Sequence, residues 1–373
     1  MMKRALVVGR GVAGLCCAKL LARHGWQVVV SGSSPRSAPA LVLNDITYDL
    51  LLDIWQAGDD LLKGSYSLNE RKTRWGQEGT VSTVVQPGVA IRGDQLIRNL
   101  LECLVKEHER EVHIDDSSTH LHKLIDPTSL SCSVHEFDWV VDASGRTSQI
   151  AQLLGVVKHN SFGQRYVIGL EVPLTKMDQR HTYWIEAVHD GWVFLAPLGR
   201  DKALLQAMLP AVPKEPLIAI TDLLAQTQMI RTQVADASGP ASVFIASPQI
   251  TDPLWGSGWI TVGDAAISLD PLCGDGTGYA IRGVILATSI LNGLASGLLR
   301  SDCLHHYSLR LHKAFFSHLR ECMSYYSIVF SSLAWKTEIE RMKNAFSNDK
   351  YHPADIESFR YGLKGFELVP LNS

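Results

Sequence analysis

The N-terminal part of the chain reads Ala5-Leu6-Val7-Val8-Gly9-Arg10-Gly11-Val12-Ala13-Gly14. The four apolar residues at its start are typical of a parallel strand that is buried on both faces. The glycines after them have the spacing Gly-x-Gly-x-x-Gly, and a mostly apolar segment that ends near Gly25 predicts a helix. A second strand is predicted at Gln27-Val28-Val29-Val30. This order of strand, glycine turn, helix and strand predicts a dinucleotide-binding unit.

Each glycine of this turn has a separate steric role. Gly9 permits the tight turn, Gly11 lets the backbone approach a pyrophosphate, and Gly14 lets the helix pack closely on the strand. The start of the helix, at Val12 and Ala13, presents unpaired backbone N–H groups to the phosphates. These five residues are therefore the predicted pyrophosphate site.

The end of the second strand departs from the usual pattern. Such units commonly have an acidic residue there, which binds the ribose hydroxyls. In this chain the position is occupied by Ser31. A serine hydroxyl can accept a hydrogen bond, but it carries no charge to strengthen that bond. We therefore expect Ser31 to contact the cofactor and to hold its adenosine end weakly.

The composition of the 373-residue chain is that of a globular protein with room for two domains. It has 46% hydrophobic residues, 20% charged residues and a net charge of −3, which excludes a disordered chain and disfavours a nucleic-acid partner. Seven scattered cysteines without a Cys-x-x-Cys pair indicate reduced thiols, and so a cytoplasmic protein. The apolar stretch Gly283–Leu299 is short for a membrane span and predicts a buried helix, with no membrane partner.

A second glycine-rich turn lies near residue 270. A strand at Trp259-Ile260-Thr261-Val262 ends in Gly263-Asp264, which puts the Asp264 carboxylate beside a ribityl or phosphate chain. The loop that follows enters a long helix, whose positive N-terminal end suits the negative charge of a reduced flavin ring. The loop residues predicted to bind the cofactor are Pro271, Gly274, Asp275, Gly276, Thr277 and Gly278. Two such turns are more than a nicotinamide site requires.

Three blocks of the sequence now resemble one family in the family's own order. They are Gly9–Gly14, Phe137-Asp138-Trp139-Val140-Val141-Asp142-Ala143-Ser144-Gly145-Arg146-Thr147-Ser148, and Gly263–Gly278. The chain thus resembles the FAD-dependent oxidoreductases of the p-hydroxybenzoate hydroxylase type, which include aromatic hydroxylases and tryptophan halogenases. The segment Ile91-Arg92-Gly93-Asp94-Gln95-Leu96 is similar to a family segment whose arginine reaches the cofactor, which implies this role for Arg92.

The resemblance implies FAD as the cofactor, O2 as the oxidant, and NAD(P)H or a separate flavin reductase as the electron donor. Hydroxylases of the family that bind NADPH directly often have an Asp-Gly pair in the middle block, where this chain has Ser144-Gly145. That difference weakens the case for direct reduction by NADPH and favours a separate reductase, or a partner that triggers reduction.

The same resemblance implies an α/β architecture. An FAD-binding Rossmann-like domain of the glutathione-reductase type is expected from residues 1–50, 85–160 and 255–300. A mainly antiparallel β substrate domain is expected to be inserted at 161–254, together with part of 51–84. From Leu304 onward apolar residues recur every three or four positions, so residues 301–373 are expected to form a helical C-terminal region.

The substrate side contains a degenerate halogenase-like segment, Gly191-Trp192-Val193-Phe194-Leu195-Ala196-Pro197. It is similar to the halogenase pattern Gly-Trp-x-Trp-x-Ile-Pro, but Phe194 replaces the second tryptophan and Ala196 the isoleucine. The lysine that halogenases use also has no counterpart, since the aligned stretch is Gly64-Ser65-Tyr66-Ser67. Halogenation is therefore the least favoured reaction.

The remaining features resemble flavoproteins that help to build cysteine tryptophylquinone by hydroxylating a tryptophan in a partner oxidase precursor. The expected function is thus an FAD-dependent monooxygenase acting on an indole or phenol ring, with a peptidyl tryptophan of a quinoprotein oxidase precursor as one substrate. The alternatives left open are a small-molecule aromatic hydroxylase, a flavin-dependent reductase or dehydrogenase, and an assembly factor that mainly holds its partner.

Candidate catalytic residues lie on the expected antiparallel sheet. They are Tyr183, Glu186 and Trp192, together with Asp45 earlier in the chain. Glu186 or Asp45 is the candidate base for the ring proton, although alternation along a strand puts Tyr183 and Glu186 on opposite faces. Each residue also fits ordinary sheet packing or a solvated surface. No metal site is expected, because the pairs His120/His122 and His305/His306 have no further ligands at a fitting spacing and are expected on the surface.

Overall fold

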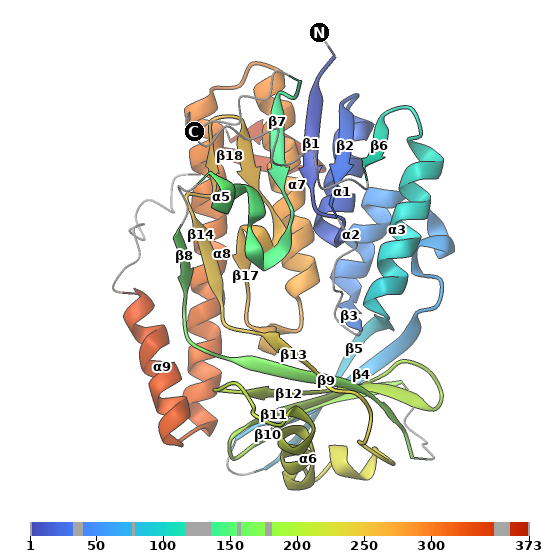
Figure 1. Cartoon of the computed structure of the whole chain (residues 1–373), viewed down its shortest axis with the longest axis vertical. Helices are drawn as coiled ribbons and strands as arrows, with labels where there is room; N and C mark the ends of the chain where they lie inside the picture. Colours follow the sequence, from blue (N-terminus) through green and yellow to red (C-terminus); the bar gives the residue numbers. More distant parts are fainter. Residues whose placement is uncertain are drawn as a thin grey trace.

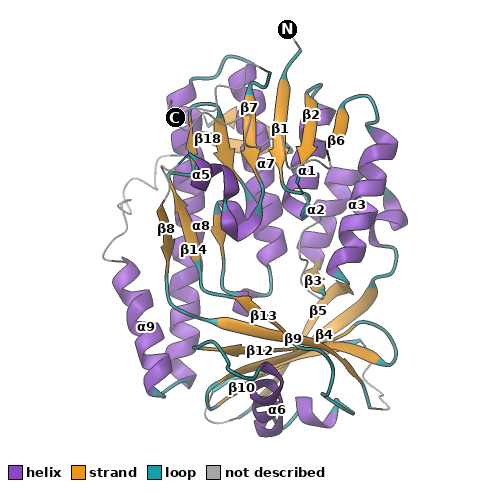
Figure 2. Cartoon of the chain, in the orientation of Figure 1, coloured by secondary structure: helices purple, strands orange, loops and turns teal. Residues whose placement is uncertain are grey.

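The structure is a computed structural model that describes residues 2–32, 40–76, 79–115, 136–154, 158–175, 181–346 and 359–371. Two large sheets organise these residues, one in the upper part of Figure 1 and one across its lower part. Helices lie beside the upper sheet, and a long helix extends down the left side past the lower sheet (Figures 1 and 2). The space between the two sheets holds the candidate site.

The upper sheet has six strands and contains the first glycine turn. In spatial order they are β15 (Trp255–Gly256), β16 (Trp259–Thr261), β7 (Trp139–Asp142), β1 (Arg4–Val8), β2 (Gln27–Ser31) and β6 (Val112–Asp115). All neighbours run parallel except the β15–β16 pair. Val7 joins a core that includes the large helices, whereas Leu6 and Val8 join a separate cluster on the other face. The prediction that this strand is buried on both faces is confirmed.

The helices of the main core are α1 (Val12–Arg23), α2 (Asp45–Trp55), α3 (Gly93–Glu107) and α7 (Gly276–Ala295). Helix α1 contacts each of the other three, so the glycine turn at its start is held from several directions. Helix α7 is the one described helix that is long and apolar enough to cross a membrane, but most of it is buried between α1 and α8. The short helix α5 (Gln149–Leu153) packs on the other face of the sheet.

The lower sheet has eight strands drawn from distant parts of the chain. Their order is β13 (Ser242–Ile245), β9 (Tyr166–Pro173), β12 (Lys202–Leu209), β11 (Gly191–Pro197), β10 (Thr182–Val188), β4 (Tyr66–Arg74), β5 (Val81–Ile91) and β3 (Leu41–Asn44). Every neighbouring pair is antiparallel except β4 and β10. The sheet is mainly antiparallel, as predicted, but it also takes in β3 and the end of β5, which the sequence assigns to the FAD domain.

One face of the lower sheet is covered by α6 (Pro216–Gln226) and the short helix η3 (Ile230–Thr232). Its opposite face is turned toward the upper sheet (Figure 2). A small third sheet consists of β17 (Ile267–Ser268), β14 (Gln249–Asp252) and β8 (Lys158–Ser161). The chain segments on either side of this small sheet run between the two large ones.

The C-terminal region contains the long helices α8 (Arg300–Val329) and α9 (Leu333–Phe346), as the apolar spacing predicts. It is not wholly helical, because β18 (Tyr361–Lys364) and β19 (Glu367–Pro370) form a hairpin. This hairpin packs on α7, where the Ser289 hydroxyl donates to the backbone carbonyl of Phe366 at 2.6 Å. The period of the apolar residues identifies the helices but carries no information about the hairpin after them.

The prediction that both His305 and His306 lie on the surface is wrong for His306. Its side chain is only 4% exposed and lies edge-on against the rings of Phe359 and Tyr361, whereas His305 is exposed. Burial, helped by the charge of Arg310, lowers the pKa of His306 from 6.5 to about 4. The other pair, His120 and His122, lies outside the described residues.

This buried histidine predicts a loss of stability in mild acid. Between pH 6.5 and 4 the unfolded chain binds a proton at His306 that the folded protein does not, so the free energy of unfolding falls as the pH falls, by at most about 1.4 kcal/mol per pH unit from this group. Replacing His306 with phenylalanine should make this slope shallower. Urea unfolding at a series of pH values measures how the free energy of unfolding depends on pH, with His305→Phe as the control at an exposed histidine. If the slope of His306→Phe equals that of the wild type, His306 is not the group that causes the loss of stability in acid.

Candidate active site

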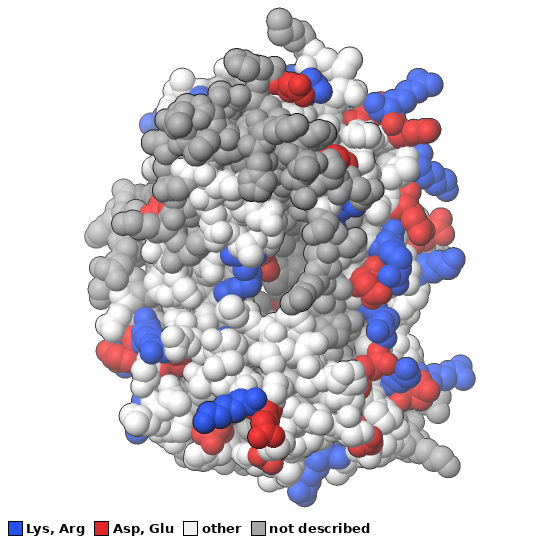
Figure 3. Space-filling view, viewed as in Figure 1, with Lys and Arg blue, Asp and Glu red and all other residues white. Residues whose placement is uncertain are grey.

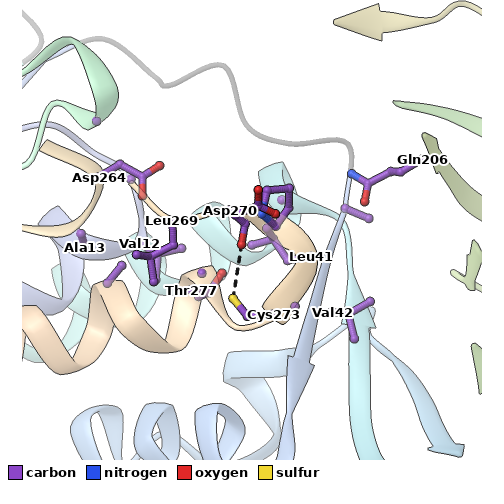
Figure 4. A pocket seen from close by; sticks show the side chains of 18 of the residues that line it. Val12, Ala13, Leu41, Val42, Gln206, Asp264, Leu269, Asp270, Cys273 and Thr277 are labelled. Atoms are coloured by element: carbon purple, nitrogen blue, oxygen red, sulfur yellow. Dashed lines mark hydrogen bonds between the residues drawn. The ribbon is translucent and has the colours of Figure 1, made fainter. Parts of the chain in front are cut away.

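A cavity of about 600 Å³ lies between the two large sheets, within the range of small-molecule and cofactor sites. The face drawn in Figure 3 is hollowed near its centre, in the region between these sheets. Figure 4 shows the cavity from close by, with Asp264, Val12 and Ala13 toward one end and Gln206 toward the other. The two glycine-rich turns and the lower sheet therefore line one continuous space.

The first glycine turn is built as its spacing requires. Gly9 has a φ of +120°, and its N–H donates to the backbone carbonyl of Ser31 at 2.8 Å. A Cβ on Gly9 would lie 2.2 Å from the carbonyl oxygen of Ala143, and a Cβ on Gly14 would lie 2.0 Å from the carbonyl oxygen of Gly9. Both glycines thus allow backbone to approach backbone.

Gly11 differs, because a Cβ there would meet no protein atom within 4 Å. Gly11, Val12 and Ala13 line the cavity at the start of α1, where no side chain caps the helix. The first N–H groups of a helix have no partner inside it and favour an anion in front of them. This part of the cavity therefore fits the pyrophosphate of a dinucleotide.

Ser31 lies at the end of β2, one residue before the cavity-lining Gly32. The side chain is 1% exposed, and its hydroxyl has no hydrogen-bond partner among the residues that the structure describes. The hydroxyl is enclosed by protein and does not line the cavity, so its predicted contact with the cofactor stays a prediction.

Asp264 lies in the short helix η4 (Gly263–Ala265), and its side chain is open to the cavity. The protein that encloses it raises the pKa of its carboxyl, and the guanidinium of Arg146 acts against that rise. Arg146 is itself fixed by donating to the carbonyl of Ser247 at 2.6 Å. Arg146 does not itself line the cavity, but the Asp264 carboxylate can accept hydrogen bonds from the hydroxyl groups of a cofactor chain.

The second glycine-rich turn divides into lining and supporting residues. Pro271, Gly274, Gly276 and Thr277 line the cavity. Asp275 instead supports the loop, because it accepts a hydrogen bond from Thr47 of α2 at 2.7 Å and pairs with Arg282 of α7. Gly278 lies behind it, where a Cβ would be 2.2 Å from the Asp275 carboxylate. Four of the six predicted loop residues thus line the cavity, and Asp275 anchors the loop from behind.

Cys273 also lines the cavity, in the short helix η5 (Pro271–Cys273). Its thiol donates to the backbone carbonyl of Asp270 at 3.4 Å (Figure 4). Burial raises the pKa of this thiol to about 12, so it stays protonated at neutral pH. A protonated thiol is a poor nucleophile, and Cys273 therefore contributes shape to the cavity.

The lower sheet supplies an aromatic wall. Tyr183 and Ile185 on β10 and Trp192 and Phe194 on β11 line the cavity, as the alternation along each strand requires. Burial raises the pKa of Tyr183 to about 12, so its hydroxyl is neutral at physiological pH. Four large apolar or aromatic groups in one wall are suited to hold a flat ring and to keep water away from it.

Glu186 lies on the other face of the same strand, under η3. Its carboxylate accepts hydrogen bonds from the backbone N–H groups of Gln228 at 2.7 Å and Met229 at 3.0 Å, and it pairs with Arg74 at 3.4 Å. These contacts satisfy a fully buried carboxylate but give it no access to the cavity. The predicted role of Glu186 as a base therefore has no support from its position.

Two further predicted residues lie at or beyond the edge of the cavity. Asp45, the first residue of α2, is exposed, but it is near enough for its charge to raise the pKa of Tyr183. Arg92 precedes α3 and is exposed; it pairs with Glu171 of β9 and does not line the cavity. Its predicted contact with the cofactor stays a prediction.

Several polar residues that line the cavity were missed by sequence reasoning. Among them are Arg71 on β4, Gln86 on β5 and Gln206 on β12. The sequence gives little indication that Arg71 faces a cavity, because β4 carries many polar residues and its partner β10 lies more than one hundred positions away. Simple alternation from Tyr66 would also place Arg71 on the wrong face, because an irregularity between Leu68 and Glu70 shifts the register of β4.

A buried charge network behind the second turn was also missed. Arg165 is fully buried and pairs with Asp270 at 2.9 Å and with Glu338 of α9 at 3.2 Å. Asp270 also accepts from the Tyr326 hydroxyl at 2.7 Å and from the backbone N–H of Leu272 at 2.9 Å. The network therefore connects the C-terminal helices directly to the loop that lines the cavity.

No protein-family model and no curated protein sequence matches the chain. Solved structures do. The peptidyl tryptophan dihydroxylase QhpG, essential for tryptophylquinone cofactor biogenesis, has a TM-score of 0.75 and 18% identity, over 100% of this chain and 86% of that chain. The chondrochloren halogenase CndH, an FAD-dependent enzyme, has a TM-score of 0.75 and 17% identity, over 96% and 93%. 2-Methyl-3-hydroxypyridine-5-carboxylic acid oxygenase has a TM-score of 0.65 and 19% identity, over 96% of each chain. The chain thus has a fold shared by flavin-dependent hydroxylases and halogenases.

Proposed function

We propose that the protein is an FAD-dependent monooxygenase that hydroxylates an aromatic ring. The observation that carries the proposal is the single cavity between the sheets, which has both glycine-rich turns on one side and an aromatic wall on the other. A dinucleotide cofactor and a flat substrate can thus meet in one enclosed space. The fold shared with flavin-dependent hydroxylases supports the same conclusion.

The residues at the cofactor end fit FAD. The backbone of Gly9, Gly11, Val12 and Ala13 would hold the pyrophosphate, and Gly32, directly after Ser31, lines the cavity beside them. Asp264 would bind the chain between phosphate and ring, and the loop from Pro271 to Thr277 would lie against the ring. When bound and reduced, the flavin would activate O2, and O2 would supply the oxygen atom that is transferred to the ring.

The chain's own residues bind and orient the substrate. Ile185, Trp192 and Phe194 would hold the ring by its faces and edges and exclude water from it. Tyr183, with its hydroxyl protonated, is available as a hydrogen-bond donor to the substrate. Asp45, at the edge of the cavity near Tyr183, is the remaining candidate to accept the ring proton after hydroxylation.

The finer form of the proposal is that the ring belongs to a peptidyl tryptophan in a partner oxidase precursor. The likeness to QhpG supports it, because it extends over the whole of this chain, including the C-terminal helices. The competing form is hydroxylation of a free aromatic compound, which the likeness to 2-methyl-3-hydroxypyridine-5-carboxylic acid oxygenase supports.

An isotope experiment tests the reaction class. The holoenzyme is supplied with a reduced flavin source under 18O2 and with tryptophan-containing peptides, indoles or phenols. We expect one 18O atom in the product ring by mass spectrometry. Oxidation without 18O would indicate a reductase or dehydrogenase, and a halogenated ring in the presence of chloride or bromide would indicate a halogenase. Either outcome would overturn the proposal.

The electron donor is tested without oxygen. Because the middle block has Ser144-Gly145 in place of an Asp-Gly pair, we expect NADH or NADPH alone to bleach the bound flavin slowly. Addition of a flavin reductase should accelerate the bleaching at 450 nm by about tenfold or more. Rapid bleaching by NAD(P)H alone would contradict this and indicate a self-sufficient enzyme.

A further inference from the structure

The proposed function assigns no role to Arg71, a charged residue that lines the cavity. It lies on β4, directly opposite Tyr183 on the parallel strand β10, and both side chains line the cavity. The guanidinium is half-buried, and its Nε is fully buried with no hydrogen-bond partner. Neither a hydrogen bond nor an ion pair joins the Arg71 guanidinium to any other residue that the structure describes. A guanidinium has five N–H donors, and leaving buried donors without acceptors is unfavourable.

The neighbouring cations on the same strand show that this arrangement is specific to the cavity face. Lys72 and Arg74, which alternate to the outer face, pair with Glu70 at 3.8 Å and with Glu186 at 3.4 Å. Arg71 has no such acidic neighbour on its own face. Of the two acidic residues that line the cavity, Asp264 is near Arg146, and Asp270 is paired with Arg165. The exposed Asp45 is near enough to affect Tyr183 but forms no ion pair with Arg71.

Two uncharged polar groups accompany Arg71. Tyr183 comes from the strand on one side, and Gln86 of β5 comes from the strand on the other, two positions along from Val84, the residue opposite Arg71. All three side chains point to the cavity from adjacent strands. Among the described residues, neither the Gln86 carboxamide nor the Tyr183 hydroxyl has a hydrogen bond within the chain. Three polar groups without partners in the described part of the chain, on three adjacent strands of one cavity wall, are the pattern of a recognition site.

We infer that Arg71, Tyr183 and Gln86 form a subsite for a carboxylate carried by the aromatic substrate. The planar guanidinium matches the two oxygens of a carboxylate, and the phenol and carboxamide can donate to the same group. The wall formed by Ile185 and Phe194 would then hold the ring beside its charged substituent. This inference rests on the proposed function, because it assigns the class of substrate for that same cavity.

The carboxylate can come from two sources with the same chemistry. It is the acid group of a free aromatic acid, or it is an Asp or Glu side chain next to the target tryptophan in a peptide. The subsite predicts that an acid binds better than its uncharged amide in both cases, because the amide leaves the guanidinium unpaired. The affinity for a ligand can be measured in the absence of catalysis. It therefore tests the subsite separately from the reaction.

The first arm uses oxidised holoenzyme titrated with indole-3-propionate and with indole-3-propionamide, followed by the change in flavin absorbance. For the wild type we expect the acid to bind at least about tenfold more tightly than the amide. In Arg71→Met this preference should disappear, and in Arg71→Lys it should be reduced. Lys72→Met removes the same charge from the opposite face and should leave the preference unchanged.

The second arm uses the acetylated, amidated peptides Asp-Trp-Gly and Asn-Trp-Gly in the same titrations. A preference for the Asp peptide that depends on Arg71 identifies a peptide source, whereas a preference only between the small molecules identifies a free acid. The subsite is overturned if neither acid is preferred over its amide by the wild type, or if no acid perturbs the flavin. It is also overturned if Arg71→Met weakens FAD binding and leaves the preference intact, since Arg71 would then belong to the cofactor site.

The two proposals fail in distinguishable ways. If binding shows a carboxylate preference that depends on Arg71, but no product contains 18O, the proposed reaction is contradicted and the subsite is supported. If the wild type and Arg71→Met both hydroxylate uncharged aromatic compounds as fast as aromatic acids, the proposed reaction is supported and the subsite is contradicted.

Discussion

Replacing Arg165 with methionine is expected to lower the free energy of unfolding by about 3–5 kcal/mol. The guanidinium is fully buried and is the shared partner of two buried carboxylates, Asp270 and Glu338. Its removal leaves the buried Asp270 without its cation and Glu338 with only the half-exposed Arg341, which is the costly way to break a buried ion pair. Urea unfolding of the variant and the wild type measures the loss.

The consequence should extend to the cofactor, because Asp270 begins the second glycine-rich turn. Asp270 accepts from the backbone N–H of Leu272, and Leu272 and Cys273 line the cavity. A loop that loses the Arg165 anchor should hold FAD at least about tenfold more weakly, measured by flavin fluorescence on dilution. Arg165 acts here as a positioning residue, since its own side chain does not line the cavity.

Arg341 offers a matched control. It pairs with the same Glu338 at 2.7 Å, but its side chain is 45% exposed. Exposed ion pairs contribute about 0–1 kcal/mol, so Arg341→Met should change stability little and leave FAD binding intact. Equal losses in Arg165→Met and Arg341→Met would contradict the view that the buried pairs anchor the loop.

The first glycine turn could be predicted from the sequence because its chemistry is local. The requirement for glycine at Gly9 and Gly14 arises from contacts with β7 and within the turn, and these accompany any strand, turn and helix of this type. The loop from Pro271 to Gly278 was predicted for the same reason. In each case a short segment fixes both the backbone path and the side of the molecule that faces the cofactor.

The substrate side could be predicted only in part. Alternation correctly separated Tyr183 from Glu186, but it could not tell which face would meet the cavity, because that depends on α6 and η3 covering one side. Arg71 was missed because its strand is polar and pairs with β10, far away in the sequence. Arg165 was missed because its partners Asp270 and Glu338 lie 105 and 173 positions away, and no local pattern connects them.

A valine in place of Gly14 would not test FAD binding separately from folding. A Cβ there lies 2.0 Å from the carbonyl oxygen of Gly9 and would disturb the fold itself. Gly11 is the informative position. Its φ is −75°, which any residue can adopt, and an added Cβ meets no protein atom within 4 Å. The apoprotein of Gly11→Val should therefore unfold within about 1 kcal/mol of the wild type.

FAD binding should respond very differently to the same change. Gly11 lines the cavity at the start of α1, where the pyrophosphate is proposed to lie, so the valine side chain would occupy the space that the phosphates need. We expect the affinity for FAD to fall by at least about a hundredfold, measured by titrating apoprotein with FAD and following flavin fluorescence. Gly199→Val, in the turn between β11 and β12, also meets no protein atom within 4 Å and should leave FAD affinity unchanged. If Gly11→Val binds FAD as the wild type does, the pyrophosphate cannot lie against this turn, and the assignment of the cofactor end must be abandoned.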